Sequence, residues 1–205
     1  KNSIHTDDSP DYGSDVPMFK ARGIIPCLAP IDLVEILLDS SKVSMYNKFS
    51  NGRKDMYHLH EGNLREMELD VDNNDEIKPI EVNKGVSKIV ETETKVPFSN
   101  KTIKTRTLLH ARKLRDGAYI LVSRSVEPAD SSAKLGVKNE IIWGVNVLRR
   151  VPGFDNKVDL TNFAQASSTV VPKFLAHKVG MIAICDFFKH LRKLENNETV
   201  CENIS

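Results

Sequence analysis

The sequence predicts an α+β domain in which a curved antiparallel sheet grips one long helix. The second half of the chain holds five consecutive segments rich in Val, Ile, Thr and aromatic residues, and the stretch from Pro172 to Leu194 is apolar around most of its middle turns. A helix that is apolar nearly all round is buried or covers something apolar. A sheet of many strands curls and needs a partner for one face. The final helix is the one segment long and apolar enough to supply it.

The composition is that of a soluble globular chain with material for a real core. The 205 residues suit one domain with tails, which we place at residues 17–195 between a disordered leader (1–16) and a flexible tail (196–205). Hydrophobic residues make up 40% of the chain and charged residues 28%. Because 29 basic residues nearly balance 28 acidic ones, no bulk charge favours nucleic acid or tight binding to an anionic membrane.

The cysteines indicate a reducing compartment. Cys27, Cys185 and Cys201 are odd in number and far apart, so they predict neither a disulfide framework nor a metal pair. No signal peptide or membrane-spanning run is visible. We expect a cytoplasmic protein.

The first third of the chain predicts a strand followed by a helix. Residues 18–26 alternate loosely, as in a strand, and residues 30–39 have helical spacing, with Pro30 suited to a first turn. Residues 41–47 suit one further turn. Residues 51–85 are the least regular part, with a strand expected around 53–60 and a helix or strand around 64–71.

The β segments follow in close succession. Arg115-Asp116-Gly117 predicts a tight hairpin turn with Gly at the position that needs a positive φ. Residues 128–138 predict a long irregular connection. The strands expected from Val, Ile, Thr and aromatic content lie at residues 86–96, 102–114, 118–126, 140–151 and 157–167.

Alternation divides the strand at 118–126 into two faces. Ile120, Val122 and Arg124 share one face, and Tyr119 and Leu121 share the other. A guanidinium among apolar residues inside a protein must be paired, because an isolated buried charge is very costly.

A partner for that guanidinium is available on the neighbouring strands. A carboxylate of Glu91 or Glu93 could pair with Arg112 or Arg124. An ion pair at a solvated sheet edge and a cationic fork inside a cavity, which would select a phosphate or hydroxyl headgroup, both fit this pattern.

Motifs of catalysis and metal binding are weak. His58 and His60 have a spacing that can bind metal, but no nearby Cys or His completes a set. No nucleophile elbow, phosphate-binding loop or glycine fingerprint is present. We therefore expect no enzyme activity, no metal and no cofactor.

Five pieces of the chain, in order, resemble the START domain, the lipid-transfer module named after the steroidogenic acute regulatory protein. They span residues 18–194 and read PIDLVEILLDSSKVSMYN, SKIVETETKVPF, TLLHARKLRDGAYILVSRSVE, NEIIWGVNVLRRV and VVPKFLAHKVGMIAICDFFKHLRKL. The resemblance implies a helix-grip fold, in which a curved sheet encloses a hydrophobic tunnel and the C-terminal helix closes it as a lid. It implies one bound lipid and no catalysis, and it places a membrane-contacting loop at residues 127–138.

The resulting hypothesis is a domain that binds one phospholipid, sterol or sphingolipid and transfers it between membranes through transient contact, without nucleic acid. A lipid-sensing regulatory domain and, less favoured, a helix-grip enzyme using His110 with Glu93 are the alternatives. The residues expected to line the lipid site are Arg124, Arg112, His110, Glu93, Glu91, Ile120, Val122, Trp143, Asn146, Phe163, Gln165, Val179, Ile182 and Phe188.

Overall fold

The computed structural model describes residues 3–6, 18–65, 85–95, 102–126, 139–168, 171 and 173–194. These residues form one antiparallel sheet of eight strands in the order β1-β2-β8-β7-β6-β5-β4-β3. The strands are β1 (Ser3–Thr6), β2 (Met18–Pro26), β3 (Ser50–Glu61), β4 (Val86–Lys95), β5 (Thr102–Lys113), β6 (Tyr119–Ser125), β7 (Asn139–Val151) and β8 (Phe154–Ser168). The helices are α1 (Pro30–Leu38), the 3-10 turn η2 (Ser40–Lys42), α2 (Val43–Tyr46) and α3 (Lys173–Lys193).

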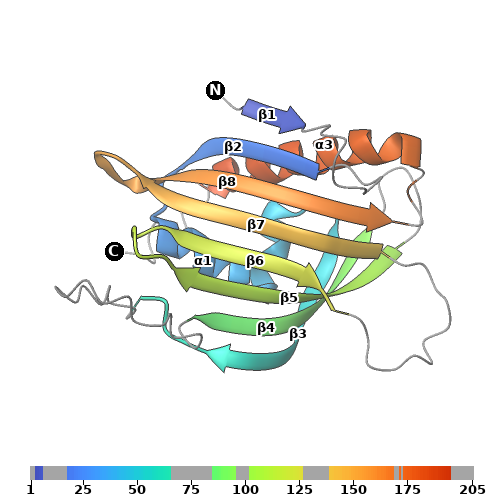
Figure 1. Cartoon of the computed structure of the whole chain (residues 1–205), viewed down its shortest axis with the longest axis horizontal. Coiled ribbons are helices and arrows are strands. Elements are labelled where there is room, and N and C mark those ends of the chain that lie inside the picture. The colour runs from blue at the N-terminus through green and yellow to red at the C-terminus, as the bar shows by residue number, and fades with distance from the viewer. Residues whose placement is uncertain are drawn as a thin grey trace.

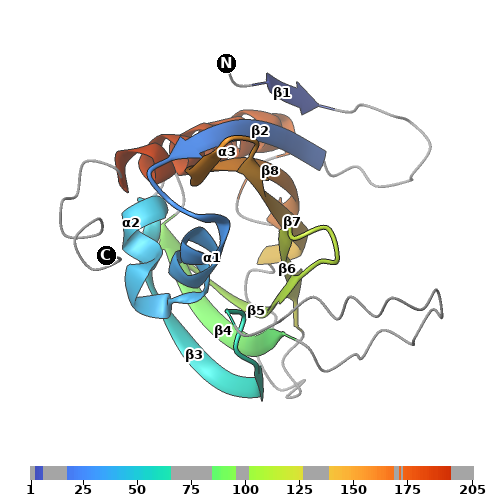
Figure 2. The same ribbon diagram turned by 90° about the vertical axis from the view of Figure 1, so that its left-hand side faces the viewer.

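The predicted α+β architecture is confirmed: the long helix follows a run of antiparallel strands, and the sheet curls around the shorter helices (Figures 1 and 2). Gly117 has a φ of 78°, as the predicted hairpin turn between β5 and β6 requires. Three predicted segments lie outside the described residues. They are most of the uncertain segment at 64–71, the expected loop at 127–138 and the tail at 196–205.

Ser3–Thr6 lies inside the segment predicted to be a disordered leader, yet it forms strand β1. It pairs with β2 from Ser3 opposite Arg22 to Thr6 opposite Phe19. The edge of a sheet offers a row of unpaired backbone groups that can order a polar segment with no strand pattern of its own. For these four residues the prediction is wrong; the other domain limits stay a prediction.

The helices lie on one side of the sheet. In Figure 1 the sheet faces the viewer, α1 lies behind it and α3 runs along β2; Figure 2 shows the sheet curving around α1 from β2 to β3. Helix α1 contacts β6, β7 and β8, and α2 contacts both α3 and β3. We call the face toward α1 the inner face.

The centre of the core lies between α1 and the inner face. Leu33 of α1, Leu148 of β7, Leu160 of β8 and Leu191 of α3 are each 0% exposed and belong to one apolar cluster. Burying a side chain of this size gains about 1.5–3 kcal/mol. This packing closes one end of the curved sheet.

Arg53 of β3 joins the sheet edge to the carboxyl end of α1. Its two terminal nitrogens donate to the carbonyl oxygens of Leu37 (2.9 Å) and Leu38 (2.8 Å) and to the Tyr46 hydroxyl (2.9 Å), while its Nε donates to the Ser40 hydroxyl (3.0 Å). The last carbonyls of a helix have no partner within it, and the helix dipole favours a cation at that end. Arg53 satisfies both demands.

We expect Arg53→Ala to lower the free energy of unfolding by about 2–3 kcal/mol, because it leaves polar groups of α1 without partners. Urea denaturation followed by circular dichroism measures the change. Arg150→Ala is the matched control: its ion pair with Asp155 is exposed on both sides, so the change should stay within about 0.5 kcal/mol. Equal losses in the two variants would contradict a capping role for Arg53.

Candidate functional site on the inner face of the sheet

The burial of β6 decides which of its faces looks into the domain. Tyr119 and Leu121 are buried in the core, whereas Ile120 and Val122 are half-buried and Arg124 is exposed. Since successive side chains of a strand point to opposite faces, Tyr119 and Leu121 define the inner face. The prediction that Arg124 lies inside the domain is therefore wrong.

The same error applies to most of the predicted lipid site. The pairing between β4 and β7 runs without a register shift, so the residues grouped with Arg124 stay together on the outer face. Alternation correctly predicted which residues share a face. That face points outward and not inward. The predicted site residues that lie outside are Arg124, Arg112, His110, Glu93, Glu91, Ile120, Val122, Trp143, Phe163 and Gln165.

On the outer face, the predicted ion pair involves a different arginine. The Glu91 Oε2 atom lies 3.2 Å from Nε of Arg106, and both side chains are partly exposed. This is the solvated sheet-surface pair that the sequence had left open as the alternative to a cavity pair. Trp143 donates from Nε1 to Oε1 of Gln165 at 2.8 Å, so these two predicted lining residues bind each other.

The proposed acid–base pair of His110 and Glu93 does not form. His110 pairs across the sheet with Ser87, whose Oγ lies 2.7 Å from its Nδ1, and Glu93 is six residues further along β4, about 20 Å away at the rise of a strand. Burial, with smaller contributions from Arg112 and His60, lowers the pKa of His110. His110 is thus a cross-strand hydrogen-bonding residue.

The inner face changes character along the strands. At the end covered by α1 it is closed by the buried leucines described above. Toward the other end, two small residues, Gly144 of β7 and Ala164 of β8, lie opposite each other, and Ser123 of β6 lies opposite Gly144. Ser123 and Ala164 are half-buried. Further from α1, the inner face of β6, β7 and β8 therefore carries smaller and more polar side chains.

Two asparagines mark the boundary between these regions. Asn146 and Asn162 face each other across β7 and β8, and Nδ2 of Asn162 donates to Oδ1 of Asn146 at 2.8 Å. Among the described residues no other hydrogen bond to either side chain is found, so one acceptor and several N–H donors stay available. The sequence left the facing of Asn146 open; the register places it on the inner face, and its role in lipid binding stays a prediction.

Helix α3 lies against β2, at the edge of this region, with its amino-terminal half. Gly180 lies against β2: a Cβ placed there would collide with the ring of Phe19, and that ring lies 5.6 Å from the ring of His177. Phe19 itself pairs with Ala164 on the inner face. The small residue at 180 lets the helix approach β2 closely.

The two halves of α3 are buried to different degrees. Ile184, Phe188 and Leu191 of the carboxyl-terminal half are buried, whereas Val179 and Ile182 are only half-buried. Of the helix residues predicted to line the site, Phe188 therefore belongs to the core, and Val179 and Ile182 lie in the less closed half. Phe174, near the start of the helix, is 82% exposed.

A buried ion pair on the inner face was not foreseen. Lys88 of β4 is 5% exposed, and its Nζ lies 2.8 Å from Oδ2 of Asp55 on β3, which also accepts a hydrogen bond from Ser40. Burial alone would raise the pKa of Asp55, but the hydrogen bonds from Lys88 and Ser40 outweigh it and lower the pKa. These residues are far apart in the sequence and follow no motif, so no local pattern could have revealed their contact.

Comparison with solved structures identifies this arrangement. The chain superposes on the human StarD13 (DLC2) lipid transfer and protein localization domain with a TM-score of 0.68 and 14% identity, over 94% of this chain and 83% of that one. It superposes on human STARD10 with a TM-score of 0.66 and 14% identity, over 97% and 72% of the two chains. A STAR-related lipid transfer protein from Xanthomonas axonopodis gives 0.61 and 15% over 93% of each.

The chain has the START helix-grip fold. No family model matches the sequence, and no curated protein matches it by sequence either. Identities near 14% show the fold alone, so the ligand of this START fold has to be argued from its own residues.

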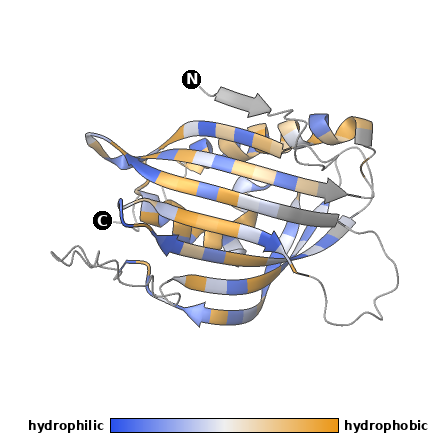
Figure 3. Cartoon of the chain, viewed as in Figure 1, coloured by the Kyte–Doolittle hydropathy of each residue, from blue (hydrophilic) through white to orange (hydrophobic). Residues whose placement is uncertain are grey.

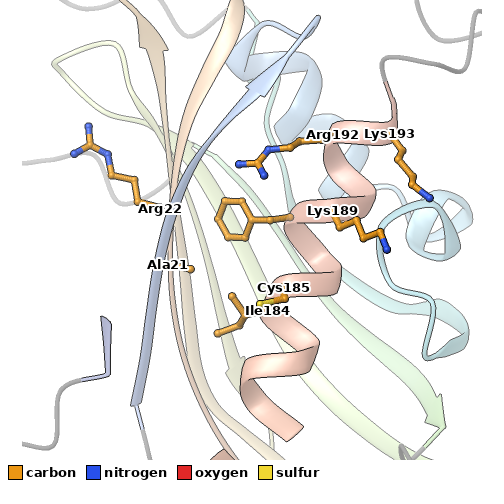
Figure 4. A pocket seen from close by; sticks show the side chains of 8 residues that line it. Ala21, Arg22, Ile184, Cys185, Lys189, Arg192 and Lys193 are labelled. Atoms are coloured by element: carbon orange, nitrogen blue, oxygen red, sulfur yellow. The ribbon is translucent and has the colours of Figure 1, made fainter. Parts of the chain in front are cut away.

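Two surface pockets of the START fold lie among the described residues. One, of about 500 Å³, lies beside the Lys88–Asp55 pair and is lined by α1, β3 and β4 residues such as Glu35, His58 and Val86. The other, of about 280 Å³, lies between β2 and α3 (Figure 4). Its lining includes the apolar residues Ala21, Ile184 and Phe188 and the basic residues Arg22, Lys189, Arg192 and Lys193.

Metal and membrane signals are weak in the described residues. They hold no group of three or more His, Cys, Asp or Glu side chains placed to bind a metal ion. In the same residues no helix combines the length and the apolar character needed to span a bilayer.

The Lys88–Asp55 pair makes the free energy of unfolding depend on pH. Because the pKa of Asp55 is lowered in the folded state, its contribution is complete above the unfolded pKa of about 4 and is lost as the pH falls through the folded value. We expect Asp55→Asn to be less stable at neutral pH and to lose less stability than the wild type below pH about 4. Urea denaturation across this range, with Asp155→Asn as the exposed control, measures the difference; parallel pH profiles would contradict the assignment.

Proposed function

We propose that the chain binds one lipid between the inner face of the sheet and the amino-terminal half of α3, and transfers it between membranes without catalysis. The observation that carries this proposal is the unequal closure of the interior. One end is packed with fully buried leucines, while the other presents the small residues Ser123, Gly144 and Ala164. The amino-terminal half of α3, which lies against the neighbouring strand β2, has apolar side chains that are only partly buried. Two of the structural neighbours are named as lipid transfer proteins, which supports the same function.

The polar groups of this site favour a lipid with an uncharged head. Asn146, Asn162 and Ser123 supply amide and hydroxyl groups, which suit a hydroxyl or carbonyl. The cationic fork of Arg112 and Arg124, which would have selected a phosphate, lies on the outer face. Among the described inward residues, the buried cation Lys88 is already neutralised by Asp55. We therefore propose a sterol or another neutral lipid as the ligand.

The energetics of transfer follow from the lining. Each methylene moved out of water gains about 0.8 kcal/mol, so an enclosed hydrocarbon compensates for leaving a bilayer. The exchange requires the amino-terminal half of α3 to move, and this half holds fewer buried residues than the rest of the helix. Regions with fewer buried apolar contacts open at lower free-energy cost. The lid movement should therefore be local to that half.

Native mass spectrometry and vesicle assays test the function. We expect a one-to-one complex with a neutral lipid after purification, and extraction of cholesterol or diacylglycerol from vesicles in preference to phosphatidylserine. A protein that stays free of lipid and extracts none would refute lipid binding. Preferential extraction of phosphatidylserine would refute the uncharged head, and lipid binding without movement between vesicles would favour the sensing alternative.

Replacing both asparagines tests their role. Asn146→Leu/Asn162→Leu removes donor and acceptor together, a change that costs little folding stability because no group is left unpaired. We expect extraction of the neutral lipid to fall about tenfold, the equivalent of one lost net hydrogen bond. Thr161→Leu, the neighbour of Asn162 that faces outward, is the control and should extract normally. Unchanged extraction by the double variant would mean that the asparagines serve the fold alone.

A further inference from the structure

The outer face of the sheet carries an apolar surface at the centre of β6 and β7. The strands are apolar on both faces: Leu121 and Leu148 point inward into the core, while Ile120, Val122 and Val147 point outward. Figure 3 shows apolar residues along β6 and β7, and the register assigns these residues to the outer face. We call the following half-buried residues the outer apolar block: Ile89, Leu108, Ile120, Val122, Trp143, Val145, Val147 and Phe163.

The block is continuous across the strands. The register places Val122 opposite Val145, and Val145 opposite Phe163, in one cross-strand row. Ile120 and Val147 form the next row. Directly opposed side chains of an antiparallel pair lie about 5 Å apart, so these five residues touch through three strands. An antiparallel sheet with a solvated face normally alternates apolar-in and polar-out, and this one does not.

Arginines flank the block. Arg112 lies opposite Ile120, and Arg124 lies opposite Leu108. Within the described ranges neither guanidinium has a carboxylate partner, whereas three other arginines of this face do. Those pairs are Arg106 with Glu91, Arg22 with Asp159, and Arg149 with Asp116. Among the described residues, the charge left over on this face is therefore positive and lies at the edge of the apolar centre.

This composition matches a protein interface. Interfaces have an apolar core enriched in aromatic residues and Arg, with a polar rim. A second copy of the chain, docked face to face, would bring together two surfaces with the same surplus of positive charge, and like charges across an interface are unfavourable. A carboxylate-bearing partner instead gives each guanidinium a bidentate acceptor.

We propose that the outer apolar block with Arg112 and Arg124 is a docking surface for an acidic protein segment that also carries apolar side chains. This surface lies on the side of the sheet opposite the proposed lipid site. Binding there leaves the lipid site and α3 accessible. The domain could in this way be held on a protein partner while it exchanges its ligand.

Peptide display tests the surface while its natural partner is unidentified. A random peptide library is selected on the wild-type protein, with depletion on Arg112→Glu/Arg124→Glu. We expect enriched peptides to combine Asp or Glu with aliphatic or aromatic residues. In fluorescence anisotropy, these synthesised peptides should bind the double variant at least about tenfold more weakly, and binding to the wild type should weaken as salt rises.

A second variant separates the apolar contribution from the charge. Val122→Thr/Val145→Thr keeps β-branched side chains and both arginines, and it should also weaken peptide binding, while cholesterol extraction and thermal unfolding stay near wild type. Failure to enrich acidic peptides, or equal binding to all three proteins, would overturn the proposal. Two further results would overturn it. If the wild type binds phosphatidylserine vesicles and both variants do not, the surface serves a membrane. If the wild type forms a dimer in sedimentation velocity and both variants do not, the surface binds a second copy.

Discussion

The packing of α1 into the curve of the sheet is the contact on which the rest of the structure depends. Leu33, Leu148 and Leu160 have no exposed surface and belong to one apolar cluster, and Leu191 brings the carboxyl-terminal half of α3 into it. Close-packed interiors tolerate few voids, so this end of the domain is a solid core. Among the described residues, the fully buried leucines gather at the end of the sheet that α1 covers.

Everything proposed for the site follows from that asymmetry. Beyond Asn146 and Asn162 the inner face carries small side chains, and the helix above it is held close to β2 through Gly180 but packs less deeply. A sheet that is closely packed at one end, with a less tightly packed helix beside the other, is the arrangement on which the proposed lipid site rests. The Asn146–Asn162 pair lies between these two regions.

The opposite face of the same strands has a separate physical character. Its apolar centre and the arginines beside it alternate along each strand with the inward residues. They therefore point away from the interior. The Lys88–Asp55 pair shows the converse case, a charge buried inside only because a carboxylate from the edge strand meets it. Within the described residues, Lys88 on the inner face is thus neutralised by Asp55, whereas Arg112 and Arg124 on the outer face have no carboxylate partner.

The sequence predicted the secondary-structure elements better than their tertiary arrangement. Residue type and spacing determined the strands, the helix at residues 30–39, the turn at Gly117 and the long final helix, because these depend on local periodicity and backbone preference. Ser3–Thr6 could not be foreseen, since its order comes from pairing with β2.

The direction of the sheet's faces could not be foreseen either. Ile120 and Val122 are as apolar as Leu121, so alternation groups them correctly but does not say which group meets α1. The sequence by itself determined the elements, their order and the sets of residues that share a face. Only the tertiary structure decided which set is inside, because that depends on where the helices pack, and no local pattern records it.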